Sequence, residues 1–76
     1  MPGKVAIYPN PTTDLFYFNV PGDALSVKIY DLSGRVVKEE RKLMNNSVNV
    51  SSLLKGLYKV MITTTEGNYV TSLIIK

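Results

Sequence analysis

The side-chain types that most often carry catalysis or bind metals are missing from this sequence. The 76 residues include no histidine and no cysteine, so the chain has no Ser-His-Asp or Cys-His arrangement and no imidazole or thiolate metal ligand. Its acidic residues follow neither the D-x-D-x-D-G spacing of a calcium loop nor the facing pair that a glycosidase requires. We therefore expect no catalytic residues, no cofactor and no metal site. We interpret the acids as turn formers and solvated charges: Asp14, Asp23, Asp31, Glu39, Glu40 and Glu66.

Aromatic and basic side chains offer other routes to ligand binding. Tyr17, Tyr30 and Tyr69 are candidates for a platform that stacks on sugars or bases, although packing in the core or across strands is the favoured role for each. The net charge is +3, and the basic residues are spread along the chain, with Glu39 and Glu40 interrupting their densest group. A phosphate-binding stripe requires closer clustering, so no nucleic-acid partner is expected.

The elements that would position these side chains are predicted to be short strands, and the stretch LSVKIYDLSGRVV shows the pattern most clearly. Leu25, Val27 and Ile29 recur at every second position, which places them on one face of a strand. After them, Asp31 can accept hydrogen bonds from backbone N–H groups, and Gly34 can adopt a positive φ angle. The stretch therefore predicts a β-hairpin.

Similar alternation recurs along the chain, and Pro, Gly, Asn and Asp separate the runs. Residues 51–56 are predicted to form one helical turn with Gly56 as its left-handed C-cap, and Gly67 is predicted to supply positive φ to a tight turn at residues 66–68. Residues 73–75 are apolar on both faces, so their inward side is left open. The residues expected in the core are Phe16, Phe18, Val27, Ile29, Tyr58, Val60 and Ile62.

The spacing of these runs favours an all-β fold. Six to seven strands at intervals of about 8–12 residues, with no long helical period, are typical of a small antiparallel β-sandwich, and an open barrel is the alternative. The length predicts one domain, which we assign to residues 5–76, with residues 1–4 as a linker or an addition made for expression. No apolar run approaches about 20 residues, so no membrane-spanning segment is expected.

Several motifs in a set order resemble those of a known family. They are YPNPT, FYF, VKIYDLSGRVV and VNVSSLLKGLYKV, followed by LIIK at the end of the chain. In this order they resemble the C-terminal sorting domain of cargo proteins of the type IX (Por) secretion system of Bacteroidetes. The resemblance extends from about Val5 to Lys76, and it implies an immunoglobulin-like β-sandwich of six to seven strands.

This resemblance implies a non-catalytic address on a larger exported protein. The cargo domain, N-terminal to this chain, would cross the inner membrane with a signal peptide, and the outer-membrane translocon would then read the address in the periplasm. A sortase-like peptidase would remove the domain at the cell surface, where the cargo is anchored to lipopolysaccharide or released. The alternative is an accessory module that binds carbohydrate or protein at the cell surface through exposed tyrosines.

The last strand and its terminal lysine are the predicted recognition site. Family members often carry a basic residue just before the final apolar triplet, and this chain has Ser72 there, which leaves the apolar strand and Lys76 as the better candidates. We expect recognition by addition of the strand to a partner, and the same exposed edge would support homodimers by strand pairing. The candidate recognition residues are Tyr69, Leu73, Ile74, Ile75 and Lys76.

Overall fold

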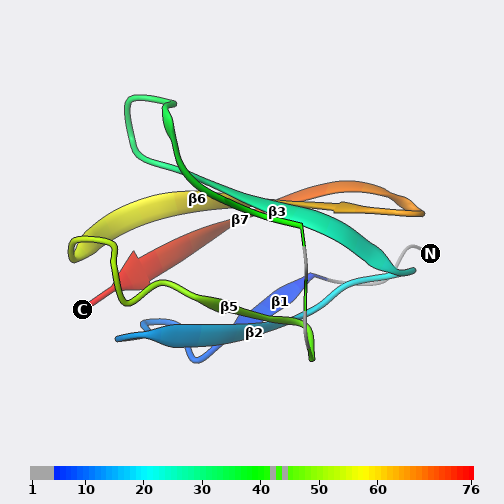
Figure 1. Cartoon of the computed structure of the whole chain (residues 1–76), viewed down its shortest axis with the longest axis horizontal. Helices are drawn as coiled ribbons and strands as arrows, with labels where there is room; N and C mark the ends of the chain where they lie inside the picture. The colour runs from blue at the N-terminus through cyan, green and yellow to red at the C-terminus, as the bar shows by residue number, and fades with distance from the viewer. Residues whose placement is uncertain (1–4, 42, 44) are drawn as a thin grey trace.

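Seven short strands make up the fold in the computed structural model, which describes residues 5–41, 43 and 45–76 (Figure 1). No helix in these ranges has the length and apolar character needed to span a membrane. Residues 1–4, interpreted from the sequence as a linker or an addition, lie outside the described part. The strands are β1 (Ala6–Tyr8), β2 (Leu15–Asn19), β3 (Ala24–Tyr30), β4 (Val36–Glu40), β5 (Ser47–Asn49), β6 (Gly56–Thr64) and β7 (Gly67–Ile75).

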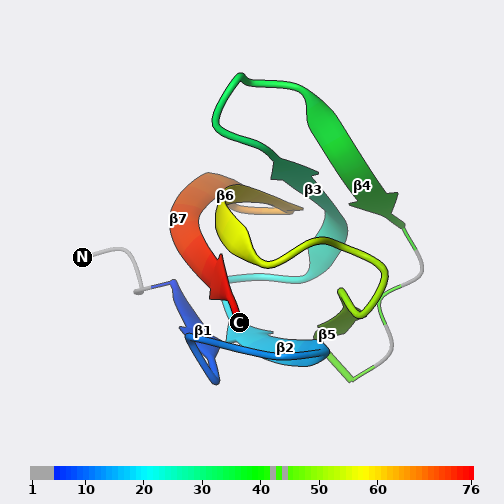
Figure 2. The ribbon, with the colours of Figure 1, turned by 90° about the vertical axis from the view of Figure 1, so that its left-hand side faces the viewer.

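The strands form two antiparallel sheets that face each other (Figures 1 and 2). One sheet has the order β1-β2-β5 and the other the order β4-β3-β6-β7. In the lettering used for immunoglobulin-like sandwiches, the two sheets are A-B-E and C′-C-F-G. The strand β4 corresponds to C′, because it pairs with β3 and does not lie beside β5. The predicted antiparallel sandwich is therefore confirmed, and the open barrel does not form.

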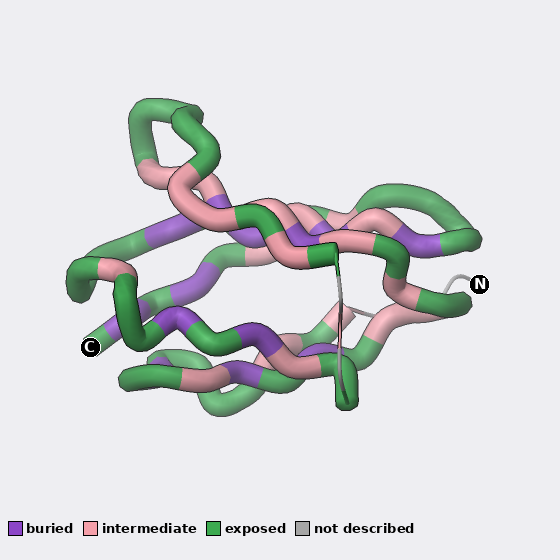
Figure 3. Tube along the Cα trace, in the orientation of Figure 1, coloured by how far each residue is buried: buried purple, intermediate pink, exposed green. Residues whose placement is uncertain are grey.

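The core lies between the two sheets, and buried residues alternate with more exposed ones along most strands (Figure 3). All seven residues expected there are buried. Burial of a large apolar side chain stabilises the fold by about 1.5–3 kcal/mol relative to exposure, so these residues account for much of the driving force. The core also includes four residues that the sequence left unassigned or assigned to recognition: Val48, Val50, Leu73 and Ile75.

A bulge overturns the predicted alternation at one residue of β3. Leu25 is 52% exposed, although its spacing predicts that it shares one face with Val27 and Ile29, which are buried. The pairing of β3 with β6 shifts between Ala24 and Ser26, so Leu25 is the extra residue of a bulge and turns away from the core. A single inserted residue breaks the two-residue period from that point on.

The strand β4 forms one edge of the larger sheet and is lined with charge. Lys38 Nζ lies 4.0 Å from a carboxylate oxygen of Glu40, and Arg41 Nε lies 3.0 Å from one of Glu39. Charged side chains on an edge strand discourage pairing with another chain. This agrees with the interpretation of Glu39 and Glu40 as solvated charges.

The segment between β5 and β6 contains a tight turn in place of the predicted helical turn. The N–H of Leu53 donates to the carbonyl of Val50 (2.9 Å), which closes a β-turn. The hydroxyl of Tyr58 donates to the carbonyl of Leu54, a bond known in immunoglobulin-like sandwiches as the tyrosine corner. The prediction that Gly56 caps a helix is wrong, because Gly56 begins β6 with a φ of 154°.

At the other end of the sandwich, the β2–β3 turn packs against the β6–β7 turn. The N–H of Thr65 donates to the carbonyl of Asp23 (3.0 Å), and the N–H of Asp23 donates to Thr65 Oγ1 (3.1 Å). A Cβ on Gly22 would lie 2.6 Å from Thr65 Oγ1 and from Glu66 Cγ, so this close approach requires glycine. Gly67, predicted inside the turn, is instead the first residue of β7, with a φ of 136°.

Candidate recognition site on the C-terminal strand

The five recognition residues predicted from the sequence lie on β7 and at the chain end, and they point in different directions. Leu73 and Ile75 are buried in the core, at 0% and 3% exposure. Tyr69 faces the same side of the strand and is half-buried. Ile74 points to the outer face and is 43% exposed, and Lys76 is exposed. In the folded domain a partner can therefore reach Ile74 and Lys76 but not Leu73 or Ile75.

Two residues of the β1–β2 loop cover the backbone edge of the second half of β7. Asn10 Nδ2 donates to the carbonyl of Ser72, and Asn10 Oδ1 accepts from the N–H of Ile74, both at 3.0 Å. The N–H of Thr12 donates to the carbonyl of Ile74 (2.9 Å), and the carbonyl of Thr12 accepts from the N–H of Lys76 (2.8 Å). We call Asn10 and Thr12 the clasp. The side-chain amide of Asn10 has one donor group and one acceptor, so it supplies the pair of bonds that a neighbouring peptide group would make.

The local sequence explains why these two residues pair with β7. Pro9 and Pro11 have no backbone N–H, so they cannot extend the ladder between β1 and β2. Thr12 is 2% exposed, its hydroxyl donates to the carbonyl of Leu15, and it forms a parallel bridge with Ile75. The end of β7 therefore reaches across to the smaller sheet (Figure 2). The sequence predicted a loop here and gave no signal for contacts that join positions 62 residues apart.

The clasp limits how a partner strand could pair with β7. The outward carbonyl of Ser72 and both outward backbone groups of Ile74 already have partners inside the domain. In an antiparallel strand the N–H and C=O of every second residue point to the same edge, so the next such position back along β7 is Val70. Strand addition to the second half of β7 therefore requires displacement of the clasp.

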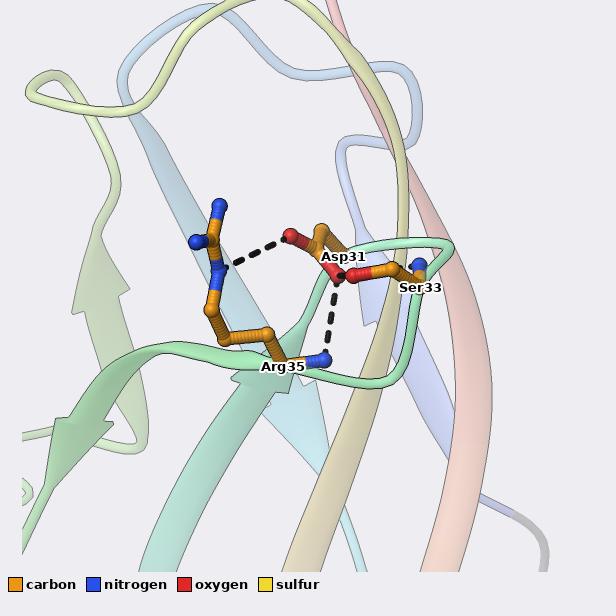
Figure 4. Close-up of polar contacts among 3 residues, drawn as sticks. All are labelled: Asp31, Ser33 and Arg35. Carbon is orange, nitrogen blue, oxygen red and sulfur yellow. Dashed lines mark hydrogen bonds and ion pairs between the residues drawn. The ribbon is translucent and has the colours of Figure 1, made fainter.

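The β3–β4 turn is organised by one carboxylate (Figure 4). Asp31 Oδ1 accepts from the N–H and the hydroxyl of Ser33 (2.9 and 2.6 Å) and from the N–H of Arg35 (3.0 Å), and Arg35 Nε lies 3.5 Å from Asp31 Oδ2. The hydroxyl bond from Ser33, followed by the N–H bond from Arg35, lowers the pKa of Asp31 below its ordinary 3.8. Gly34 has a φ of 91°, and its N–H donates to the carbonyl of Asp31 (3.0 Å). Both Asp31 and Gly34 therefore shape this turn.

The other side chains considered for ligand binding, the acids and the tyrosines, do not form a common site. Among the described residues, no three acidic side chains gather closely enough to hold a metal ion. Tyr17 stacks on Tyr8, with ring centroids 5.9 Å apart and an interplanar angle of 21°. Tyr30 and Tyr69 lie on the other sheet. Tyr17 is thus on a different sheet from the other two tyrosines considered for a stacking platform.

Two comparisons relate this chain to known proteins. Residues 6–76 match the family described as the secretion system C-terminal sorting domain. A beta-agarase D of Zobellia galactanivorans is 32% identical to the chain over 72 residues. That match covers 95% of this chain but only 15% of the agarase, so the chain corresponds to a small part of that protein.

Proposed function

From the premise that the chain belongs to the family of secretion system C-terminal sorting domains, we propose how it directs its cargo. The domain is a non-catalytic sorting signal of type IX secretion, C-terminal to a cargo domain, and such cargo is exported to the cell surface or the extracellular space. The match to residues 6–76 covers every described strand. That single observation supports residues 5–76 as one sorting domain.

The signal is read as a folded surface and not as a loose tail. The clasp fixes the backbone of β7 with four hydrogen bonds, and Leu73 and Ile75 anchor it in the core. These contacts leave Ile74 and Lys76 as the accessible members of the predicted recognition set, with Tyr69 half-buried. Recognition by the outer-membrane translocon therefore depends on the sandwich as well as on the terminal residues.

The route and the partners follow from this role. The cargo passes through the periplasm with the domain folded, the translocon reads it there, and a sortase-like peptidase removes it at the cell surface. The cargo is an exported enzyme or adhesin, which is then anchored or released. Pairing between two copies of the domain would use the first half of β7, because the clasp covers the second half and charges line β4.

A fusion experiment tests the sorting function. A reporter carrying an N-terminal signal peptide is joined to residues 5–76 and expressed in a Bacteroidetes host with an intact type IX system. We expect the reporter outside the cell, and we expect it to stay in the periplasm when residues 5–76 are removed or the translocon is deleted. Equal export without the domain would overturn the proposed function.

A further inference from the structure

The outer face of β6 and β7 carries exposed apolar side chains in cross-strand pairs. Leu57 lies opposite Ile74, and Met61 lies opposite Val70. The side chains of Leu57, Val70 and Ile74 are 46%, 62% and 43% exposed. The smaller sheet covers the opposite side of these strands (Figures 1 and 3), so this face is turned to solvent.

Positive charge accompanies these apolar residues. Lys59 is the only charged side chain within β6 and β7, and its Nζ donates to Ser72 Oγ across the strands (3.1 Å). Lys76 follows directly after β7. The two strands contain no carboxylate. We call this surface the outer β6–β7 face, and it consists of Leu57, Lys59, Met61, Val70, Ser72 and Ile74.

We propose that the outer β6–β7 face is the surface on which the translocon docks, and that its partner is a protein surface with an apolar centre and flanking carboxylates. This inference rests on the proposed sorting function. Leu73 and Ile75 are buried and the clasp covers the backbone edge, so the outward side chains are what the second half of β7 offers to a partner. Specificity then comes from side chains on two strands, not from addition of a strand.

The charges of the outer β6–β7 face favour one kind of partner over another. Lys59 and Lys76 have no carboxylate beside them on β6 or β7, so an acidic surface gains attraction on contact, whereas a second copy would bring lysine toward lysine. Complementary charge raises the rate of encounter and fixes the register of docking. Apolar residues at the centre of an interface contribute most of the binding energy. An acidic, apolar protein surface therefore fits this face better than another copy of the domain.

Export of a reporter fused to domains that carry a new glutamate tests the inference. The variants are Leu57→Glu, Lys59→Glu and Ile74→Glu, and Val36→Glu is the matched control. Val36 is 44% exposed, on β4 at the other edge of the same sheet. Each of the first three should lower export about tenfold or more, as expected for loss of a central contact, whereas Val36→Glu should export like the unsubstituted domain. Circular dichroism and thermal unfolding of each purified domain establish that it is folded.

The outcomes separate this inference from the proposed function. If export requires the domain but the three folded outer-face variants export as well as Val36→Glu, the docking surface lies elsewhere and the inference is wrong. If export does not require the domain at all, the sorting function itself fails. Loss of export in Val36→Glu to the same degree would show a general effect of added negative charge, and it would also overturn the inference.

Photocrosslinking identifies the occupant. A benzoylphenylalanine placed at position 70 in the full cargo should form an adduct with an outer-membrane translocon protein, and the same probe at position 36 should not. An adduct only with a second copy of the domain, only with lipopolysaccharide or with no macromolecule would overturn the proposal. Position 70 suits the probe because Val70 is exposed on the outer face and is not one of the residues bound by the clasp.

Discussion

Two segments of this domain share one local structure. In the β3–β4 turn, Asp31 Oδ1 accepts hydrogen bonds from the N–H (2.9 Å) and the hydroxyl (2.6 Å) of Ser33. After β5, Asn49 Oδ1 accepts the same two bonds from Ser51, at the same two distances. Short polar side chains often bond to the backbone two residues ahead in this way and so compete with regular secondary structure. The same pair of hydrogen bonds to one side-chain oxygen therefore occurs where β3 ends and where β5 ends.

The residue between the two bonded residues is exposed in the β3–β4 turn (Leu32) and buried after β5 (Val50). Leu32 is 70% exposed at the tip of a turn that projects from the sandwich (Figures 1 and 2). Val50 is fully buried, and its N–H donates to the carbonyl of Asp14 across the smaller sheet (2.7 Å). Local hydrogen bonds thus fix the shape of the chain, whereas packing against neighbouring strands decides whether the middle residue stabilises the core.

The largest expected contrast comes from truncating the two middle residues. Val50→Ala should lower the free energy of unfolding by about 2–3 kcal/mol, because it removes buried methyl groups and leaves a cavity. Leu32→Ala should change it by less than about 0.5 kcal/mol. Thermal unfolding of the two variants measures the difference, since 1 kcal/mol shifts the Tm of a domain this size by about 4–8 °C. Similar losses in both variants would show that the exposed turn also packs against the domain.

A smaller contrast is expected two residues further along each segment, at Gly34 and Ser52. Gly34 has a φ of 91°, whereas among the described residues only Asn45 and Asn46 have a positive φ without being glycine. Gly34→Ala should therefore cost about 1–2 kcal/mol of backbone strain. At the equivalent position of the other segment, Ser52→Ala should be within about 0.5 kcal/mol of neutral. Chemical denaturation of both variants checks this, and equal stabilities would contradict a strained turn at Gly34.

The smallest expected effect depends on pH. The hydrogen bonds from Ser33 and Arg35 lower the pKa of Asp31 in the folded state. Its contribution to stability is therefore fully present above its unfolded value near 3.8 and is lost as the pH falls through the lower folded-state value. The gap in Tm between the unsubstituted domain and Asp31→Asn should shrink in acid, whereas the gap for Asn49→Ala should stay constant. A pH-independent gap for Asp31→Asn would show that the charge of this carboxylate does not stabilise the turn.

Local patterns in the sequence were sufficient to predict the fold class and much of the core. Phe16 and Phe18, or Val60 and Ile62, are two residues apart, and a two-residue period places each pair on one face without knowledge of its partners. Asp31 and Gly34 also predict a turn from their residue types alone. The family resemblance predicted the sorting function, which no individual side chain indicates.

Features that depend on distant contacts could not be predicted from the sequence. The bulge that exposes Leu25 arises from how β3 pairs with β6, and the need for glycine at position 22 comes from the β6–β7 turn. The prolines and asparagine of YPNPT predict only a break between two strands, yet Asn10 closes the edge of β7. For the recognition site, the sequence pointed to β7 but did not show which of its side chains face outward.

The claim that most needs a direct test is that the C-terminal strand is held in the sandwich by the clasp. Amide hydrogen exchange on the isolated domain measures this at the N–H groups of Ile74 and Lys76, which donate to Asn10 and Thr12. We expect both amides to exchange slowly, and we expect Asn10→Ala to accelerate exchange at Ile74 while the central strand β6 stays protected. Exchange of both amides at the rate of an unstructured peptide in the unsubstituted domain would show a free tail, and it would contradict recognition of a folded surface.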